Sequence, residues 1–313
     1  MFNFRRGLSP TLVARLNEEY DCDGWWKAMA TDPQLFVGIR DNYLNVYWKG
    51  NSLLKLSLQE GRLHGQVHYK YMLIPEARDH YINFEDGKMS PVDLKSLFMP
   101  DLCDVASLKR SASVFASEEK AGIHKILISN PNIIDVEVAF GSESEEAGAK
   151  VAQRIDFAAL QMRSDGPELV FFEAKAFGNP ELRSGGDEPP PVVRQLKSYR
   201  EFLSNSQSQK DVIQSYQRVC SNLLSLKGIK KRYESIQSHL REVSEGRREL
   251  AINNDVRLVV FGYDRDQDTG TIWQRHCKKL RDGLENLSPG GGKLLLRKGD
   301  PNGFTNGISS PAK

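Results

Sequence analysis

The sequence predicts a mixed α/β protein with two lobes, on the basis of three observations. Short runs of alternating apolar residues, separated by turn signals, fill residues 34–72 and predict an antiparallel meander. After residue 114, segments with helical apolar spacing alternate with apolar runs of strand length. The chain of 313 residues is long enough for two modest domains or one large one, each with its own core.

Composition gives no general sign of several classes of partner and site. Lys and Arg total 43 against 41 Asp and Glu, so the net charge of +2 gives no global sign of nucleic-acid, membrane or acidic partners. No stretch approaches the roughly 20 apolar residues that span a bilayer, so we expect a cytoplasmic protein without a membrane partner. The four cysteines are scattered without a CxxC pair, which argues against zinc or disulfides and favours buried thiols: Cys22, Cys103, Cys220 and Cys277.

The first lobe, residues 1–105, is expected to be β-rich. A helix is predicted over residues 11–20, because Pro10 suits a first helical turn and apolar residues follow at helical spacing. The meander comes next, with its turns at Asp41-Asn42, Lys49-Gly50-Asn51 and Glu60-Gly61. We expect this lobe to contact substrate or a partner.

The second lobe, residues 106–287, is expected to begin with a helix over 114–129 that Asn130-Pro131 ends. Its apolar stripe also carries Glu119, and is made of Phe115, Ile123, Ile126 and Leu127. Residues 132–140 are predicted to form a strand, 154–177 a hairpin and 192–203 a helix. Gln195 is a polar residue on the inward stripe of that last helix.

The rest of the second lobe contains a long polar segment. Residues 210–252 carry dense mixed charge and are predicted to be a solvated helical insertion. Residues 255–265 return to a strand, and Trp273, Cys277, Leu280 and Leu284 mark a final amphipathic helix. The tail, residues 288–313, is rich in Gly, Pro and Asn, and we expect it to be loosely ordered apart from a short strand over 293–298.

Three charged residues interrupt the otherwise apolar hairpin. Because side chains alternate along a strand, Glu173 and Lys175 share one face. A four-residue turn over 163–166 places Asp156 opposite Glu173, whereas a two-residue turn places Asp156 opposite Lys175. In either register, two carboxylates and an ammonium group converge.

Two carboxylates that lie so close repel each other unless a cation joins them. Mg²⁺ is the natural cation here, because it takes one or two carboxylates together with water and substrate phosphate. Lys175 then has a separate role: it orients or deprotonates the attacking water, or it holds phosphate charge.

The spacing D-x(16)-E-x-K, followed by a helix with Q-x-x-x-Y, resembles the PD-(D/E)xK nuclease superfamily, in particular its branch related to recombination-type exonucleases. The matching residues, in the family's order along the chain, are Glu119, Asp156, Glu173, Lys175, Gln195 and Tyr199. The resemblance implies a restriction-endonuclease-like core, a mixed central sheet flanked by helices. It also implies metal-dependent hydrolysis of nucleic acid, most often DNA. In such enzymes Asp156, Glu173 and the main-chain carbonyl of Ala174 would bind Mg²⁺ or Mn²⁺.

The resemblance covers residues 114–285 and has departures. Ile155 replaces the proline that names the motif, and both a four-cysteine cluster and a helicase phosphate loop are absent from the sequence, which implies a stand-alone nuclease. Two rival hypotheses are a catalytically silent nuclease-like module that binds nucleic acid or protein, and an unrelated α/β scaffold with a chance E-x-K. The motif leaves open whether DNA or RNA is cut, and whether at ends or internal sites.

Overall fold

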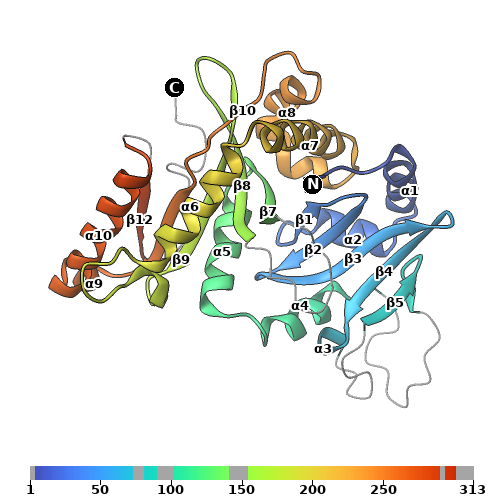
Figure 1. Cartoon of the computed structure of the whole chain (residues 1–313). Helices are drawn as coiled ribbons and strands as arrows, with labels where there is room; N and C mark the ends of the chain where they lie inside the picture. Colours follow the sequence, from blue (N-terminus) through green and yellow to red (C-terminus); the bar gives the residue numbers. More distant parts are fainter. Residues whose placement is uncertain (1–3, 73–80, 90–101, 141–153, 290–292, 301–313) are drawn as a thin grey trace, which may run out of the picture. The chain divides into compact units, whose positions relative to one another are not determined.

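The structure is a computed structural model that describes residues 4–72, 81–89, 102–140, 154–289 and 293–300. Within these ranges the chain forms two compact units (Figure 1). The mixed-sheet unit comprises Met1–Phe4, Lys125–Gln214 and Gly246–Lys313, and the meander unit comprises Arg5–His124 and Ser215–Glu245. This division differs from the predicted boundary near residue 105 and assigns most of the predicted insertion to the meander unit.

The meander unit contains a six-stranded antiparallel sheet in sequential order. Its strands are β1 (Phe36–Ile39), β2 (Tyr43–Trp48), β3 (Asn51–Gln59), β4 (Arg62–His68), β5 (Tyr81–Glu85) and β6 (Lys88–Met89). The turns at Lys49-Gly50, Glu60-Gly61 and Asp86-Gly87 each have positive φ at both residues. Such two-residue turns match the twist of adjacent strands, so the predicted meander and its turns are confirmed and extended by β5 and β6.

In the first segment of this unit, the helices are α1 (Pro10–Asp21), α2 (Trp25–Thr31), α3 (Tyr69–Met72), α4 (Val105–Ser113) and the first part of α5 (Glu118–Ser129). The predicted single helix over 114–129 is therefore wrong at its start: residues 114–117 separate α4 from α5, and Phe115 is 43% exposed. Helix α4 is held to the meander by a hydrogen bond of 2.9 Å from Trp48 Nε1 to Ser113 Oγ.

The predicted solvated insertion is also wrong, because its apolar side is buried. It folds as α7 (Ser206–Ser225), the 3₁₀ helix η3 (Ile229–Ile236) and α8 (Gln237–Ser244). The buried side chains include Tyr216, Val219, Cys220, Leu223, Tyr233, Leu240 and Val243. Hydrogen bonds of 2.8 Å from Leu8 N to Asn222 Oδ1 and from Lys227 N to Asn17 Oδ1 tie it to the start of the chain.

The mixed-sheet unit contains a sheet in the order β12-β11-β9-β8-β7, with the short strand β10 beside β9. Its strands are β7 (Ile133–Ala139), β8 (Arg154–Met162), β9 (Pro167–Ala176), β10 (Ala251–Ile252), β11 (Arg257–Tyr263) and β12 (Leu294–Lys298). Strands β9, β11 and β12 run parallel, whereas β7, β8 and β9 are antiparallel neighbours. The predicted mixed α/β class is confirmed.

Two helices of this unit pack against each other: α6 (Pro191–Leu203) and α10 (Thr271–Leu287). A Cβ added at Gly283 would lie 3.1 Å from Val193 Cγ2, so α10 approaches α6 closely there. Helix α6 lies along β9 in Figure 1, and its buried residues include Val192, Leu196, Tyr199 and Leu203. The short helix α9 (Arg265–Thr269) precedes α10.

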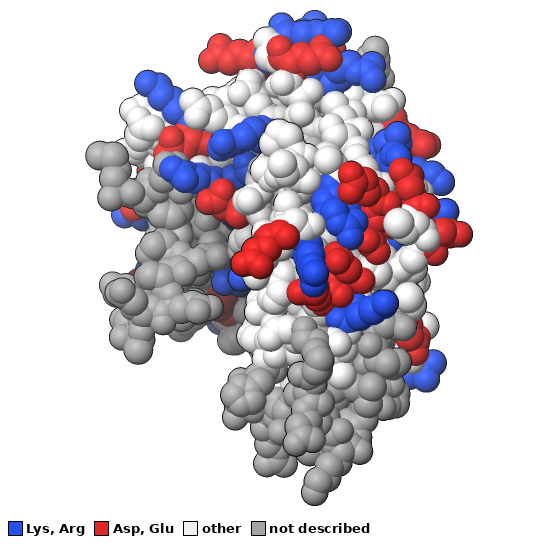
Figure 2. Space-filling model, turned by 90° about the vertical axis from the view of Figure 1, so that its right-hand side faces the viewer, with Lys and Arg blue, Asp and Glu red and all other residues white. Residues whose placement is uncertain are grey.

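The strand predicted over 293–298 is present as β12, and the rest of the tail after residue 300 lies outside the described residues. Cys220 and Cys277 are buried as expected, but Cys22 and Cys103 are exposed. No helix in the described ranges combines the length and apolar composition needed to cross a bilayer. Figure 2 shows acidic and basic side chains interspersed on one face, without a continuous region of one sign.

Candidate functional site

The hairpin of β8 and β9 brings Asp156 and Glu173 opposite each other. Its register runs from Met162 paired with Pro167 to Phe157 paired with Phe172, and extending it by one residue pairs Asp156 with Glu173. The turn is the four-residue loop, closed by a hydrogen bond of 2.9 Å from the amide of Arg163 to the carbonyl of Gly166. Of the two registers that the sequence allows, the structure has the first.

Beside this pair, a side chain of β8 replaces a backbone carbonyl as the acceptor of a hydrogen bond from β9. The amide of Ala174 donates a hydrogen bond of 2.7 Å to Oδ2 of Asp156. This bond fixes the carboxylate of Asp156 against β9. Because the amide and carbonyl of one strand residue point to the same side, the carbonyl of Ala174 also points toward the β8 side of the strand.

Lys175 lies between two carboxylates. Its Nζ atom is 2.8 Å from Oε1 of Glu173 and 2.8 Å from Oε2 of Glu181. Glu181 belongs to the 3₁₀ helix η2 (Pro180–Leu182), which Asn179 caps by accepting a 2.9 Å hydrogen bond from the amide of Glu181. Sequence reasoning missed Glu181, and its only sequence signal is the Asn-Pro pair that starts a helix directly after the strand.

The two carboxyl groups are hard to ionise where they lie. Burial raises the pKa of Glu173 to about 7, against the opposing effect of Lys175. Burial, and then the charge of Glu173, raise the pKa of Asp156 well above its usual range. Burial alone would lower the pKa of Lys175, but the Glu173 carboxylate raises it above its usual value, so the lysine stays an ammonium group.

One carboxylate oxygen of the cluster has no well-aligned hydrogen bond. Glu173 is 1% exposed, and its Oε2 atom is buried without a partner of hydrogen-bond geometry in the described part of the chain. A buried carboxylate oxygen of this kind costs free energy unless a cation or donor reaches it. This orphaned oxygen therefore fits a site that is completed by a bound cation.

Helix α6 places Gln195 and Tyr199 beside the cluster. Nε2 of Gln195 donates a 2.7 Å hydrogen bond to the Tyr199 hydroxyl, which donates a 2.7 Å bond to the carbonyl of Arg154. Gln195 also approaches Glu173 and lowers the pKa of its carboxyl. Burial, and then the charge of Glu173, raise the pKa of the Tyr199 hydroxyl. The structure thus brings both residues to the hairpin.

Glu119 lies in the first turn of α5, within the meander unit, whereas Asp156, Glu173 and Lys175 belong to the mixed-sheet unit, so the role expected for Glu119 stays a prediction. A different acid, Glu137 on β7, takes the position opposite Asp156 by extension of the β7–β8 register. Glu137 has a φ of 51°, a left-handed conformation that is uncommon for a residue with a side chain, and its charge contributes to the raised pKa of Asp156.

Two carboxylates and one carbonyl are the groups that could hold a metal ion: Asp156, Glu173 and the main chain of Ala174. They fit Mg²⁺ or Mn²⁺, which prefer oxygen ligands and keep several waters. No group of three or more His, Cys, Asp or Glu side chains in the described ranges is arranged to hold a metal ion. The predicted set of metal ligands contains only two such side chains, Asp156 and Glu173. Its third ligand would be the main-chain carbonyl oxygen of Ala174.

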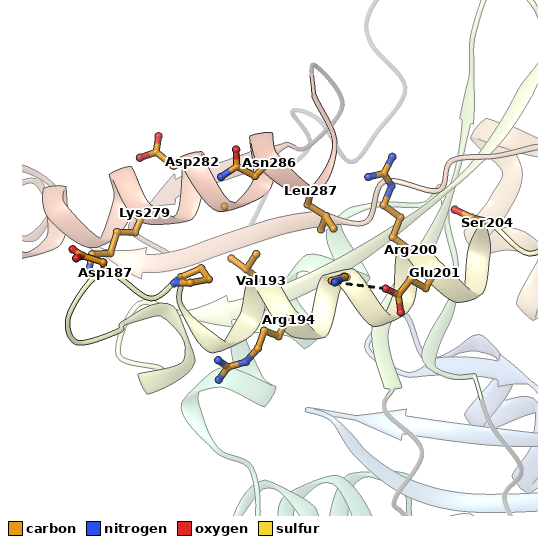
Figure 3. Close-up of a pocket in the computed structure, with 13 residues that line it drawn as sticks. Asp187, Val193, Arg194, Arg200, Glu201, Ser204, Lys279, Asp282, Asn286 and Leu287 are labelled. Atoms are coloured by element: carbon orange, nitrogen blue, oxygen red, sulfur yellow. Dashed lines mark ion pairs between the residues drawn. The ribbon is translucent and has the colours of Figure 1, made fainter.

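A cavity lies outside this cluster, between α6 and α10 (Figure 3). Its volume is about 720 Å³, and its lining includes Val193, Lys197, Arg200, Lys279 and Leu287. Neither Asp156 nor Glu173 contributes to it, so the carboxylate cluster does not open into this cavity.

No protein-family model, curated protein or solved structure matches this chain.

Proposed function

We propose that this protein is a metal-dependent nuclease with a restriction-endonuclease-like core, which hydrolyses phosphodiester bonds of nucleic acid, most often DNA. The observation that carries the proposal is the pair formed by the half-buried Asp156 and the buried Glu173 on adjacent strands, with Lys175 two residues further on and one buried oxygen of Glu173, Oε2, without a well-aligned hydrogen bond. Two neighbouring carboxylates of this kind suit a divalent cation, and phosphoryl transfer is the chemistry in which oxygen-ligated Mg²⁺ most often serves.

The metal ligands in the proposal are Asp156, Glu173 and the carbonyl of Ala174. The ion would neutralise charge on the phosphate and lower the pKa of a bound water. The hydrogen bond from the amide of Ala174 holds the Asp156 carboxylate in position before any ion arrives. Both carboxyl groups must give up their protons to bind the ion, because their pKa values are raised in the free protein.

Lys175 acts in the proposal as a cation. Its raised pKa, with Glu173 on one side and Glu181 on the other, keeps it protonated, so it donates hydrogen bonds to a phosphate oxygen or to the attacking water. In the reaction, the water oxygen forms a bond to phosphorus and the bond from phosphorus to the leaving oxygen breaks. The products are a phosphate monoester and a free hydroxyl end.

Gln195 and Tyr199 have a positioning role. Tyr199 is anchored to the backbone of β8 through the carbonyl of Arg154, and Gln195 is anchored to Tyr199. This chain of bonds sets the position of the Gln195 amide at Glu173. The meander unit, with its cations close to aromatic rings such as Lys55 near Tyr43, is proposed to contact substrate or a partner.

Incubation of the full chain with linear and covalently closed circular DNA tests the function. Cleavage is expected with Mg²⁺ or Mn²⁺ and none with EDTA, and loss of the closed circles would show internal cutting. Glu173→Gln is the matched variant, because it keeps the shape of the side chain and removes the charge. A silent nuclease-like module would retard the DNA in a gel and leave it intact.

A further inference from the structure

A second polar pocket lies in the mixed-sheet unit at the other end of β9. Its volume is about 420 Å³. Glu168, the second residue of β9, lines it, and Glu173 lies five positions further along the same strand. At the rise of a β-strand this separation is about 16 Å, so the pocket is distinct from the carboxylate cluster.

The pocket gathers positive charge. Arg163, Arg200 and Lys293 line it. Its two carboxylates already have partners: Glu168 lies 2.6 Å from Nη2 of Arg163, and Asp255 lies 3.2 Å from Nε of Arg200.

Nearby positive charges act on the ammonium group of Lys293 more strongly than the nearby negative charge does. The guanidinium of Arg257, a residue only 4% exposed, is the main cause of a lowered pKa at Lys293, and Arg163 acts in the same direction. Glu168 offsets only part of this effect. Like charges held this close cost free energy, and an anion in the pocket would turn the repulsion into attraction.

The remaining lining offers hydrogen-bond donors. Oδ1 of Asn254 accepts a 3.0 Å bond from Nε2 of Gln209, and the Nδ2 group of the same side-chain amide is a hydrogen-bond donor. Ile252 is the one apolar residue in the lining. A pocket of this composition suits a small polar anion, and its lining contains no aromatic side chain on which a base could stack.

We propose that this pocket binds a phosphate group, held by Lys293, Arg163 and the side-chain amide of Asn254. A phosphate group has three or four acceptor oxygens, which can accept from the ammonium group, from the amide and from the N–H groups of Arg163 that do not bond Glu168. The phosphate comes either from a nucleic-acid backbone or from a free phosphate or nucleotide. The inference is independent of the proposed cleavage reaction, because it involves none of the residues of the carboxylate cluster.

Titration calorimetry of the full chain with inorganic phosphate, and then with adenosine monophosphate, tests the proposal. Lys293→Gln is expected to weaken binding about tenfold or more, the effect of losing one charge-assisted hydrogen bond. Lys210→Gln removes the same charge from an exposed helical position in the same unit and should bind as the wild type does. Without ligand, Lys293→Gln should unfold at the same or a higher temperature than the wild type, because a repulsive contact is removed.

A labelled single-stranded oligonucleotide distinguishes the sources. If the phosphate belongs to a backbone, inorganic phosphate competes with the oligonucleotide, and Lys293→Gln lowers the salt dependence of its binding by about one phosphate contact. If the phosphate is free, Lys293→Gln affects only the small ligands. The proposal is overturned if the wild type binds neither ligand at millimolar concentration, or if Lys293→Gln binds both as tightly as the wild type.

Discussion

The ammonium group of Lys175 lies 2.8 Å from the carboxylate of Glu173, two residues earlier on the same strand. Alternation alone places two such side chains on one face of β9, and burial then forces them together, since Lys175 is 9% and Glu173 1% exposed. The pair is therefore both a structural contact and the centre of the proposed site. Its two functions can be separated by experiment.

Lys175→Met should abolish cleavage, and it should cost stability in a pH-dependent way. Removing one partner of a buried pair typically costs about 3–5 kcal/mol, but Glu173 can take up a proton instead of staying charged. The cost should therefore be small at pH 5.5 and large at pH 8. Thermal unfolding at both pH values measures it, and an equal loss at both would contradict the ion pair described here.

Glu181→Gln separates the two partners of Lys175. The side chain of Glu181 is 47% exposed, so loss of this ion pair should cost less than about 1 kcal/mol of unfolding free energy. Lys175 keeps its contact with Glu173, and we expect cleavage to fall by less than tenfold. A loss of activity as large as that of Lys175→Met would show that Glu181 has a direct part in catalysis.

Gln195→Leu should lower the cleavage rate with little change in fold. The substitution removes the hydrogen bond to the Tyr199 hydroxyl and the contact that lowers the pKa of Glu173. Leucine suits the apolar stripe of α6, so the change in unfolding free energy should stay within about 1 kcal/mol. Tyr199→Phe is the companion variant, because it removes the anchor of Gln195 and should reduce the rate in the same direction. Unaltered cleavage rates in both variants would show that Gln195 and Tyr199 of α6 have no part in the catalytic site.

Metal binding should be strongly pH-dependent. A carboxyl whose pKa is raised by folding binds its proton more tightly in the folded state, so the contribution of Glu173 to stability is largest below about pH 4.5 and is lost as the pH rises through about 7, its folded pKa. A metal ion binds only the deprotonated form. The affinity for Mn²⁺ should therefore rise about tenfold or more per pH unit below 7 and level off only where both Glu173 and Asp156 have lost their protons.

Calorimetry in two buffers of different ionisation enthalpy checks this, because the heat reports the protons released. Asp156→Asn should weaken Mn²⁺ binding at every pH. A Mn²⁺ affinity that is equal at pH 6 and pH 8, or unchanged in Asp156→Asn, would show that these carboxylates do not bind the metal ion.

Local patterns in the sequence predict much of the fold and the centre of the site. Alternation and turn chemistry are local, so the meander, the hairpin and the shared face of Glu173 and Lys175 follow from the sequence. Glu181 could not be predicted, because its contact depends on how the chain turns back after β9. The place of residues 210–252 depends on contacts such as that of Asn17 with Lys227, which are separated by 210 residues. The dense charge of this segment predicts a solvated helix, although its apolar side chains are buried in the fold.

The central claim is that the buried carboxylates direct metal-dependent cleavage, and a single comparison of cleavage rates tests it most directly. Wild type, Glu173→Gln and Glu201→Gln are assayed on the same DNA with Mg²⁺. Glu201 is an exposed residue of α6 outside the cluster, so its variant controls for the loss of one negative charge. The account predicts metal-dependent cleavage by wild type and Glu201→Gln, and a loss of at least about a hundredfold in Glu173→Gln. Cleavage by Glu173→Gln at the wild-type rate would contradict it.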